Sequence, residues 1–152
     1  MNKFLFIGCL LAATACGSNE KPAETAENNV DAARNFVRAA LDGKFREARD
    51  YMIQDSLNLN YLDVAERSFK HLSQEVQDGY RASSIRFHQP IINPDDSTSY
   101  IIFSNSYKND PDTLRLLRIK GQWLVDLKYL YLHDQDSADK ARFMPIPADT
   151  AK

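Results

Sequence analysis

The chain has 152 residues, with 19 basic and 21 acidic side chains and a formal net charge of −2. Its lysines and arginines are scattered and form no basic stripe, which argues against binding to nucleic acid. The five glycines lie far apart, so the sequence lacks the clustered glycines of phosphate-binding loops. Both cysteines lie within the first sixteen residues, which excludes disulfides, thiol nucleophiles and thiolate metal sites from the rest of the chain.

The first fifteen residues have the layout of a secretory signal peptide. Lys3 supplies a positive charge, and Phe4 to Ala13 form an apolar run that is followed by small residues. This run of about ten residues is too short to cross a bilayer, which takes about 20. The ending Leu10-Leu11-Ala12-Ala13-Thr14-Ala15-Cys16 resembles a bacterial lipobox, in which the cysteine is lipidated and becomes the mature N-terminus. We therefore expect residues 1–15 to be removed and Cys16 to carry fatty acids such as palmitate; cleavage that leaves the cysteine free is the alternative.

A flexible linker is expected over residues 16–28. Residues 17–29 contain no large apolar side chain and so cannot contribute to a core. A flexible tether of about thirteen residues spans about 20 Å, which suits the gap between a membrane lipid and a folded domain. One folded domain is expected over residues 29–132.

Two helices are expected at the start of this domain. Apolar residues recur at helical spacing from Val30 to Leu41, and Asn28 or Asn29 can cap the first turn. Gly43 suits the left-handed position that ends a helix. A second, short helix is expected from Lys44 to about Met52.

The third and longest predicted helix runs from about Asn58 to Asp78. Its apolar residues step by three and four positions and would form one narrow seam: Leu62, Ala65, Phe69, Leu72 and Val76. Gly79 is expected to end this helix.

After Gly79 the apolar residues recur at every second position, which predicts four antiparallel strands joined by short turns. The expected strands are Ser84–Ile92, Thr98–Tyr107, Asp112–Lys120 and Gln122–Leu130. Pro90 cannot donate to a sheet ladder, so the first strand is expected to be an edge strand or to be bulged.

A tight turn at Lys120-Gly121 predicts the register of the last two strands. On the side expected to face the helices it pairs Arg118 with Trp123, Leu116 with Val125 and Leu114 with Leu127, with Tyr129 and Tyr131 beyond. On the other side it pairs Leu117 with Leu124, Thr113 with Lys128, and Arg115 with Asp126 as a surface ion pair. The loop between the two preceding strands decides whether Ile101 and Phe103, or Tyr100 and Ile102, join this second side.

Two segments resemble parts of the nuclear transport factor 2-like superfamily. ARNFVRAALDGKFREA (residues 33–48) is similar to its opening helix pair, and LLRIKGQWLVD (residues 116–126) is similar to its closing hairpin. The nearest likeness is to small bacterial lipoproteins of that superfamily whose function is uncharacterised. The resemblance implies an α+β fold, in which helices pack on a curved four-stranded antiparallel sheet around a conical pocket. Members related to ketosteroid isomerase place acidic and hydroxyl groups in this cone, whereas the inward hairpin positions here carry no carboxylate.

Four residues are candidates for a pocket. Arg118, Trp123 and Tyr129 are expected at the rim of the apolar side, where Arg118 can lie over the tryptophan ring as a cation–π pair. These residues could orient an anionic or polar ligand; alternatively, an arginine stem simply caps a core tryptophan. His88 could act as a general base if its side of the sheet faced the cone.

No metal or cofactor site is expected. His71 and Glu75 offer two ligands on one helix, where a metal site needs three or four. Residues 133–152 are polar and interrupted by prolines, so they are expected to form a mostly disordered tail in which Phe143, Met144 and Ile146 could dock locally.

Together these patterns predict a lipid-anchored protein of the bacterial cell envelope, with the outer membrane favoured. Its domain is expected to be a non-catalytic binding or accessory module for a small apolar ligand or an envelope protein. The apolar residues on the sheet side away from the helices predict a homodimer through that face. The alternative is a small isomerase or hydrolase that uses His88 and neighbouring tyrosines.

Overall fold

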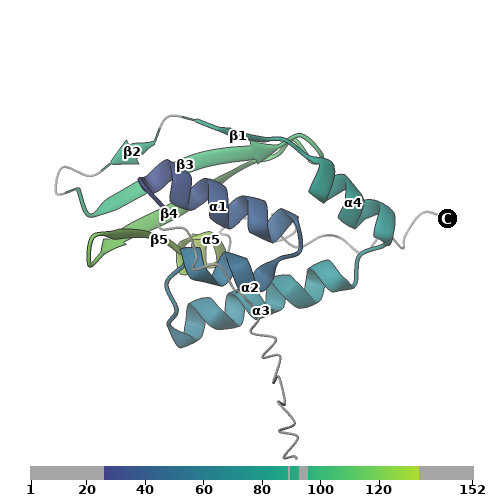
Figure 1. Ribbon diagram of the computed structural model, residues 1–152, viewed down its shortest axis with the longest axis horizontal. Helices are drawn as coiled ribbons and strands as arrows, with labels where there is room; N and C mark the ends of the chain where they lie inside the picture. The colour runs from purple at the N-terminus through teal and green to yellow at the C-terminus, as the bar shows by residue number, and fades with distance from the viewer. Residues whose placement is uncertain (1–25, 89, 93–95, 134–152) are drawn as a thin grey trace, which may run out of the picture.

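A computed structural model describes residues 26–88, 90–92 and 96–133. The predicted signal peptide, Cys16, most of the linker and all but the first residue of the predicted tail lie outside the described residues. The described chain has an α+β fold in which helices cover one face of an antiparallel sheet (Figure 1). Within these residues, no helix combines the length and the apolar character needed to span a bilayer.

Helix α1 (Asn29–Leu41) lies across the covered face of the sheet (Figure 1). Its start is capped as expected, because the side chain of Asn28 accepts a hydrogen bond from the backbone N–H of Asp31 at 3.0 Å. Gly43 follows the helix with φ +76°, the left-handed conformation expected there. The side of α1 that faces the sheet is buried through Ala32, Ala33, Phe36, Val37 and Ala40.

The second predicted helix forms as helix α2 (Phe45–Ala48) followed by the 3₁₀ turn η1 (Arg49–Tyr51). After this turn, Met52 forms a parallel bridge with Val125, and the N–H of Ile53 donates to the carbonyl of Val125 at 2.9 Å. The chain therefore covers part of the outer edge of the last strand before it enters the next helix.

The single long helix predicted over Asn58–Asp78 is wrong. The segment forms two helices, α3 (Ser56–Lys70) and α4 (Gln74–Ala82), with Ser73 between them in an extended conformation. The Ser73 hydroxyl accepts from the N–H of Val76 at 3.4 Å and so caps α4. Gly79, the predicted end, lies inside α4, where a methyl group would overlap the ring of Tyr107.

Arg38 connects α1 to the end of α4. Its guanidinium donates to the backbone carbonyls of Tyr80, Arg81 and Ser83 at 2.8 to 3.3 Å, and pairs with Asp42 at 2.7 Å. The last carbonyls of a helix have no partner within the helix, and one arginine from α1 satisfies several of them here.

The sheet has the order β1-β3-β4-β5, and β2 pairs with β3 on the same side as β1. The strands are β1 (Ile85–Phe87), β2 (Ile91–Ile92), β3 (Thr98–Asn105), β4 (Pro111–Ile119) and β5 (Gln122–Asp126), all antiparallel to their neighbours. The first predicted strand is therefore broken near Pro90 and lies at the edge, as its proline indicates. Ile101 pairs with Leu114, and both are fully buried, so Ile101 and Phe103 face the helices while Tyr100 and Ile102 face away.

The hairpin of β4 and β5 has the predicted register as far as Arg115 opposite Asp126. The strand then stops, and helix α5 begins at Leu127 and ends at His133, so the predicted pairs that involve Leu127 and Lys128 are wrong. Two side chains stabilise this change from strand to helix. Asp126 accepts from the N–H of Lys128 at 3.2 Å, and Asn58 of α3 accepts from the N–H of Leu127 at 2.7 Å.

The predicted ion pair between Arg115 and Asp126 forms, but Asp126 is not on the surface. Its side chain is only 1% exposed, because α5 returns against β4 and α3. Asp126 therefore has two roles: it caps α5 and it neutralises Arg115.

Candidate functional site

A cleft opens between the four helices α1 to α4 and the adjoining ends of β3 and β4. Its volume is about 70 Å³. Most of its wall is apolar: Val37, Ala40, Leu41, Phe45, Ala65, Phe69, Tyr80 and Phe103. Its polar lining, Asn105, Lys108, Asp110 and Asp112, lies on β3, β4 and the loop between them and is the more exposed part. We refer to this space as the cleft.

Aromatic rings occupy much of the space between the helices. The ring of Phe69 lies edge-on to Phe45 at 5.7 Å between centroids and is 6.4 Å from Tyr80, which is edge-on to Tyr107 at 5.0 Å. An apolar cavity of about 150 Å³ takes up benzene, so the remaining volume is about half of what a free aromatic molecule needs. The cleft thus fits one side chain, not a lipid chain.

Tyr80 is the titratable group deepest in the cleft. Burial raises its pKa to about 12, with smaller contributions from Tyr107 and the negative charge of Asp110. The phenol therefore stays protonated near neutral pH and can act as a hydrogen-bond donor, but not as an anionic nucleophile.

A second hollow lies on the opposite face of the sheet and is lined by Ile91, Tyr100, Ile102, Thr113 and Tyr129. This outer groove has a volume of about 280 Å³ and is shallow. The rings of Tyr100 and Tyr129 meet edge-on at 5.2 Å, so Tyr129 of α5 forms one wall. Ile91 is 65% exposed and Ile102 is 41% exposed, which leaves apolar surface in contact with water.

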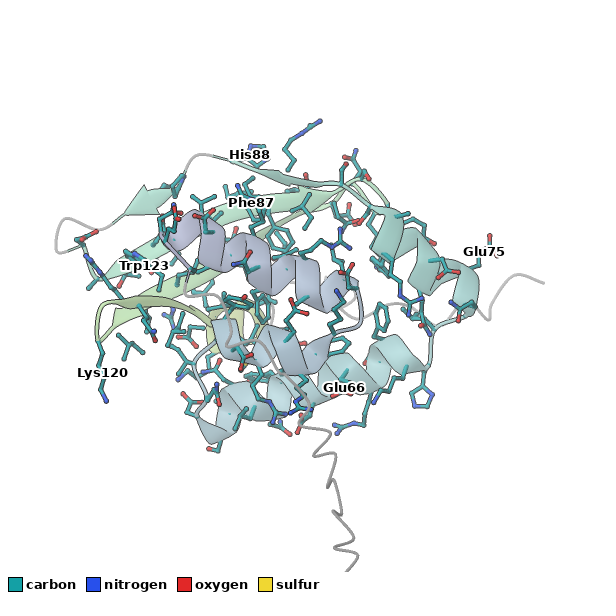
Figure 2. The ribbon with its side chains drawn as sticks, viewed as in Figure 1. Glu66, Glu75, Phe87, His88, Lys120 and Trp123 are labelled. Atoms are coloured by element: carbon teal, nitrogen blue, oxygen red, sulfur yellow. The ribbon has the colours of Figure 1, made fainter. Side chains whose placement is uncertain are left out.

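The structure does not bring the four predicted pocket residues together. Figure 2 shows His88 at the outer edge of the sheet beyond Phe87, whereas Trp123 lies towards the hairpin turn at Lys120. Tyr129 is not on the helix side as predicted but in the outer groove, because α5 replaces the end of the predicted strand.

Arg118 and Trp123 do form the expected cation–π contact, with the guanidinium 5.9 Å from the ring centroid. Trp123 is buried at 9% exposure, and Arg118 also pairs with Asp96 of the loop before β3. Neither residue lines the cleft or the outer groove. This geometry fits the second interpretation, a core tryptophan capped by an arginine.

His88 is exposed, and its backbone N–H donates to the carbonyl of Ile102 at 2.9 Å, so it continues the ladder of β1. Its register places the side chain on the sheet face opposite the helices, away from the cleft. A catalytic role for His88 in a cone between helices and sheet therefore has no geometric basis. Among the described residues, no three histidine, cysteine or acidic side chains lie close enough to hold a metal ion.

The sequence patterns did not single out the polar side of the cleft. Lys108-Asn109-Asp110-Pro111 reads as a turn, and Asn109 does adopt a left-handed conformation with φ 57°. That Lys108 and Asp110 also line the cleft depends on how the end of the sheet meets α3 and α4, which local spacing does not indicate.

Comparison with protein-family models, with curated proteins and with solved structures found no match to this chain. Its function is therefore argued from the geometry of these two surfaces.

Proposed function

We propose that this chain is a lipid-anchored accessory protein of the bacterial cell envelope, anchored at Cys16 with the outer membrane favoured. In this proposal its domain belongs to the nuclear transport factor 2-like type and acts by binding protein. The observation that carries the proposal is the exposed apolar surface around the outer groove, on the sheet face that α1 to α4 leave uncovered.

The size of the cleft supports protein binding over capture of a small apolar ligand. Its volume of about 70 Å³ has no room for an acyl chain or a ring system. The protonated Tyr80 also lacks the ionisation that an anionic nucleophile needs.

The outer face has the composition of a contact surface. Ile91, Ile102 and Ile119 are exposed, and Leu117 and Leu124, which are half-buried, lie on the same side of the sheet by register. Fully burying one such side chain contributes about 1.5 to 3 kcal/mol. Covering several of them therefore offsets a substantial part of the cost of association, which is about 4 to 15 kcal/mol.

A second copy of this chain is the partner that we propose. In a two-fold dimer the same patch meets itself, so like charges at its centre oppose association. The positive charge on this part of the face belongs to Arg115, and Asp126 neutralises it within the same molecule. Two outer faces can thus meet at this point without repulsion between their Arg115 side chains.

The test measures self-association of the mature chain by sedimentation velocity over a range of concentrations. We expect a concentration-dependent dimer for the unmodified chain and a monomer for Ile102→Asp, because the new carboxylate would be buried in the interface. Leu57→Asp is the matched control, since Leu57 is 42% exposed in the first turn of α3 and outside the outer groove. A monomer at all concentrations, or equal weakening by both substitutions, would contradict the proposal.

A further inference from the structure

We propose that the chain's own C-terminal segment Lys140–Ile146 (KARFMPI) docks in the cleft, with Phe143 or Met144 inserted between the helices and Arg142 beside Asp110 and Asp112. This occupant lies outside the described residues and is independent of the proposed dimer. Three features support the proposal: where the described chain ends, the chemistry of the cleft, and the size of its interior.

The described chain ends next to the helix that forms one wall of the cleft. The ring of Tyr131 in α5 stacks on that of Tyr61 in α3, with centroids 4.3 Å apart and planes 4° from parallel. Ala65, one turn further along α3, lines the cleft, and one helical turn advances about 5.4 Å. Residues 134–142 number nine and reach up to about 30 Å when extended, so Phe143 can reach the cleft with slack.

The chemistry of the segment complements the charge and the apolar wall of the cleft. Asp110 and Asp112 lie on the polar side together with Lys108, so the formal charge of these three side chains is −1. Arg81, whose guanidinium lies 5.6 Å from the centroid of Phe69, is paired with Asp78 at 2.8 Å and so adds little net charge. A cationic residue followed by a large apolar one suits such a site, because the cation meets the carboxylates while the apolar group is buried.

The size of the interior selects a single side chain. About 70 Å³ with an open rim accepts the end of one side chain, such as a thioether chain or the edge of a phenyl ring whose remainder lies at the rim, but not a second large group beside it. Among residues 16–25 and 134–152, which flank the described domain in the expected mature chain, large apolar side chains occur only at Phe143, Met144 and Ile146. Pro145 and Pro147 disfavour helical backbone at Met144 and Ile146, which lowers the ordering cost of an extended docked segment.

The experiment is paramagnetic relaxation enhancement on the full mature chain, with Cys16→Ser and a spin label at Ala141→Cys. We expect loss of amide signal at cleft residues such as Ala65, Phe69 and Asp110, and retention at Ile119 on the outer face. The double change Phe143→Ser and Met144→Ser should restore the cleft signals. Because these residues lie outside the described domain, we expect the domain to fold normally in the double variant, so the restored signals report the loss of docking and not a loss of structure.

Arg142→Glu tests the charge complementarity and should restore most of the lost signal, whereas Lys152→Glu should leave it unchanged. The segment could enter the cleft of its own chain or that of another chain. A mixture of isotope-labelled chains without the spin label and spin-labelled chains without isotope distinguishes these two cases, because it reports only on docking between chains. We expect no signal loss in this mixture at low concentration, because the segment docks within its own chain. Signal loss in the mixture, or equal intensity at the cleft and the outer face, would overturn the proposal. Neither result bears on the dimer, which is tested separately by sedimentation velocity with Ile102→Asp on the outer face.

Discussion

At the scale of single residues, Asn58 connects two segments that are far apart in the sequence. It is fully buried, its amide oxygen accepts from the N–H of Leu127 at 2.7 Å, and its amide nitrogen donates to Asp55 at 3.1 Å. Asp55 also accepts from the backbone N–H of Asn58 at 2.9 Å and from Lys128 at 2.7 Å. These hydrogen bonds, chiefly the backbone one from Asn58 and then the one from Lys128, lower the pKa of Asp55 to about 2. The start of α3 and the start of α5 are thereby joined by one polar cluster.

We predict that Asn58→Leu lowers the free energy of unfolding by about 1 to 3 kcal/mol, the usual cost of leaving a buried donor without a partner. The donor in question is the N–H of Leu127, and leucine keeps the branching of the asparagine side chain while it removes the accepting oxygen. Urea denaturation followed by circular dichroism measures the change. Asn60→Leu, exposed on the same helix, is the control and should stay within about 0.5 kcal/mol of the unmodified chain. Equal effects of the two substitutions would mean that the hydrogen bond to Leu127 adds no stability.

At the scale of elements, the break between α3 and α4 shows how a cap competes with an apolar seam. The apolar spacing continues through Leu72 and Val76, but Ser73 offers its hydroxyl to the N–H of Val76 and starts a new helix. The break redirects α4, and its carbonyl end then meets Arg38. Gly79 is consequently an interior residue of α4 that leaves room for the Tyr107 ring, where the seam predicted a terminus.

We predict that the effect of Gly79→Ala depends on Tyr107. In a helix interior alanine is more favourable than glycine by about 0.8 to 1 kcal/mol, so in a Tyr107→Ala background the substitution should stabilise the protein by about that amount. In the unmodified background the new methyl group overlaps the Tyr107 ring and disturbs its edge contact with Tyr80, which removes or reverses the gain. The free energies of unfolding of the four chains form a double-mutant cycle. An identical gain in both backgrounds would contradict the close approach of Gly79 to Tyr107.

At the scale of the whole molecule, the central expectation is that a cysteine-free domain is held to a membrane through Cys16. The described domain contains no thiol, so covalent attachment by thioether has one candidate once a leader that includes Cys9 is removed. Dual acylation is sufficient for stable anchoring, whereas one short chain binds only reversibly.

We predict that cells expressing the unmodified chain and supplied with an alkyne-tagged fatty acid yield a labelled protein in the membrane fraction. Cys16→Ala should be unlabelled, because it lacks the sulfur that carries the lipid. Cys9→Ala, the matched control within the same leader, should be labelled like the unmodified chain. Equal labelling of Cys16→Ala and Cys9→Ala would exclude the anchor.

Local patterns were sufficient for much of the fold. The cap at Asn28, the left-handed Gly43, the interruption at Pro90 of a strand at the sheet edge, and the pairing of Arg118 with Trp123 were all predicted and confirmed. Each depends on residues that are close in sequence or on a turn of two residues, so its energetics are local. The coarse α+β class follows from the same periods.

Contacts between distant residues decided the rest. The last strand ends at Asp126 because Asn58, 69 positions earlier, accepts the N–H of Leu127, and no local pattern contains that acceptor. Tyr129 moves to the outer groove as a result, and Asp126 becomes buried. The amino-acid sequence alone determined where α1 begins and ends, how the strands alternate and that no thiol lies in the domain. Only the tertiary structure decided that Tyr100, Ile102 and Tyr129 lie on the uncovered sheet face and how little space the packed aromatic rings leave in the cleft, because both depend on the packing of side chains from several elements at once.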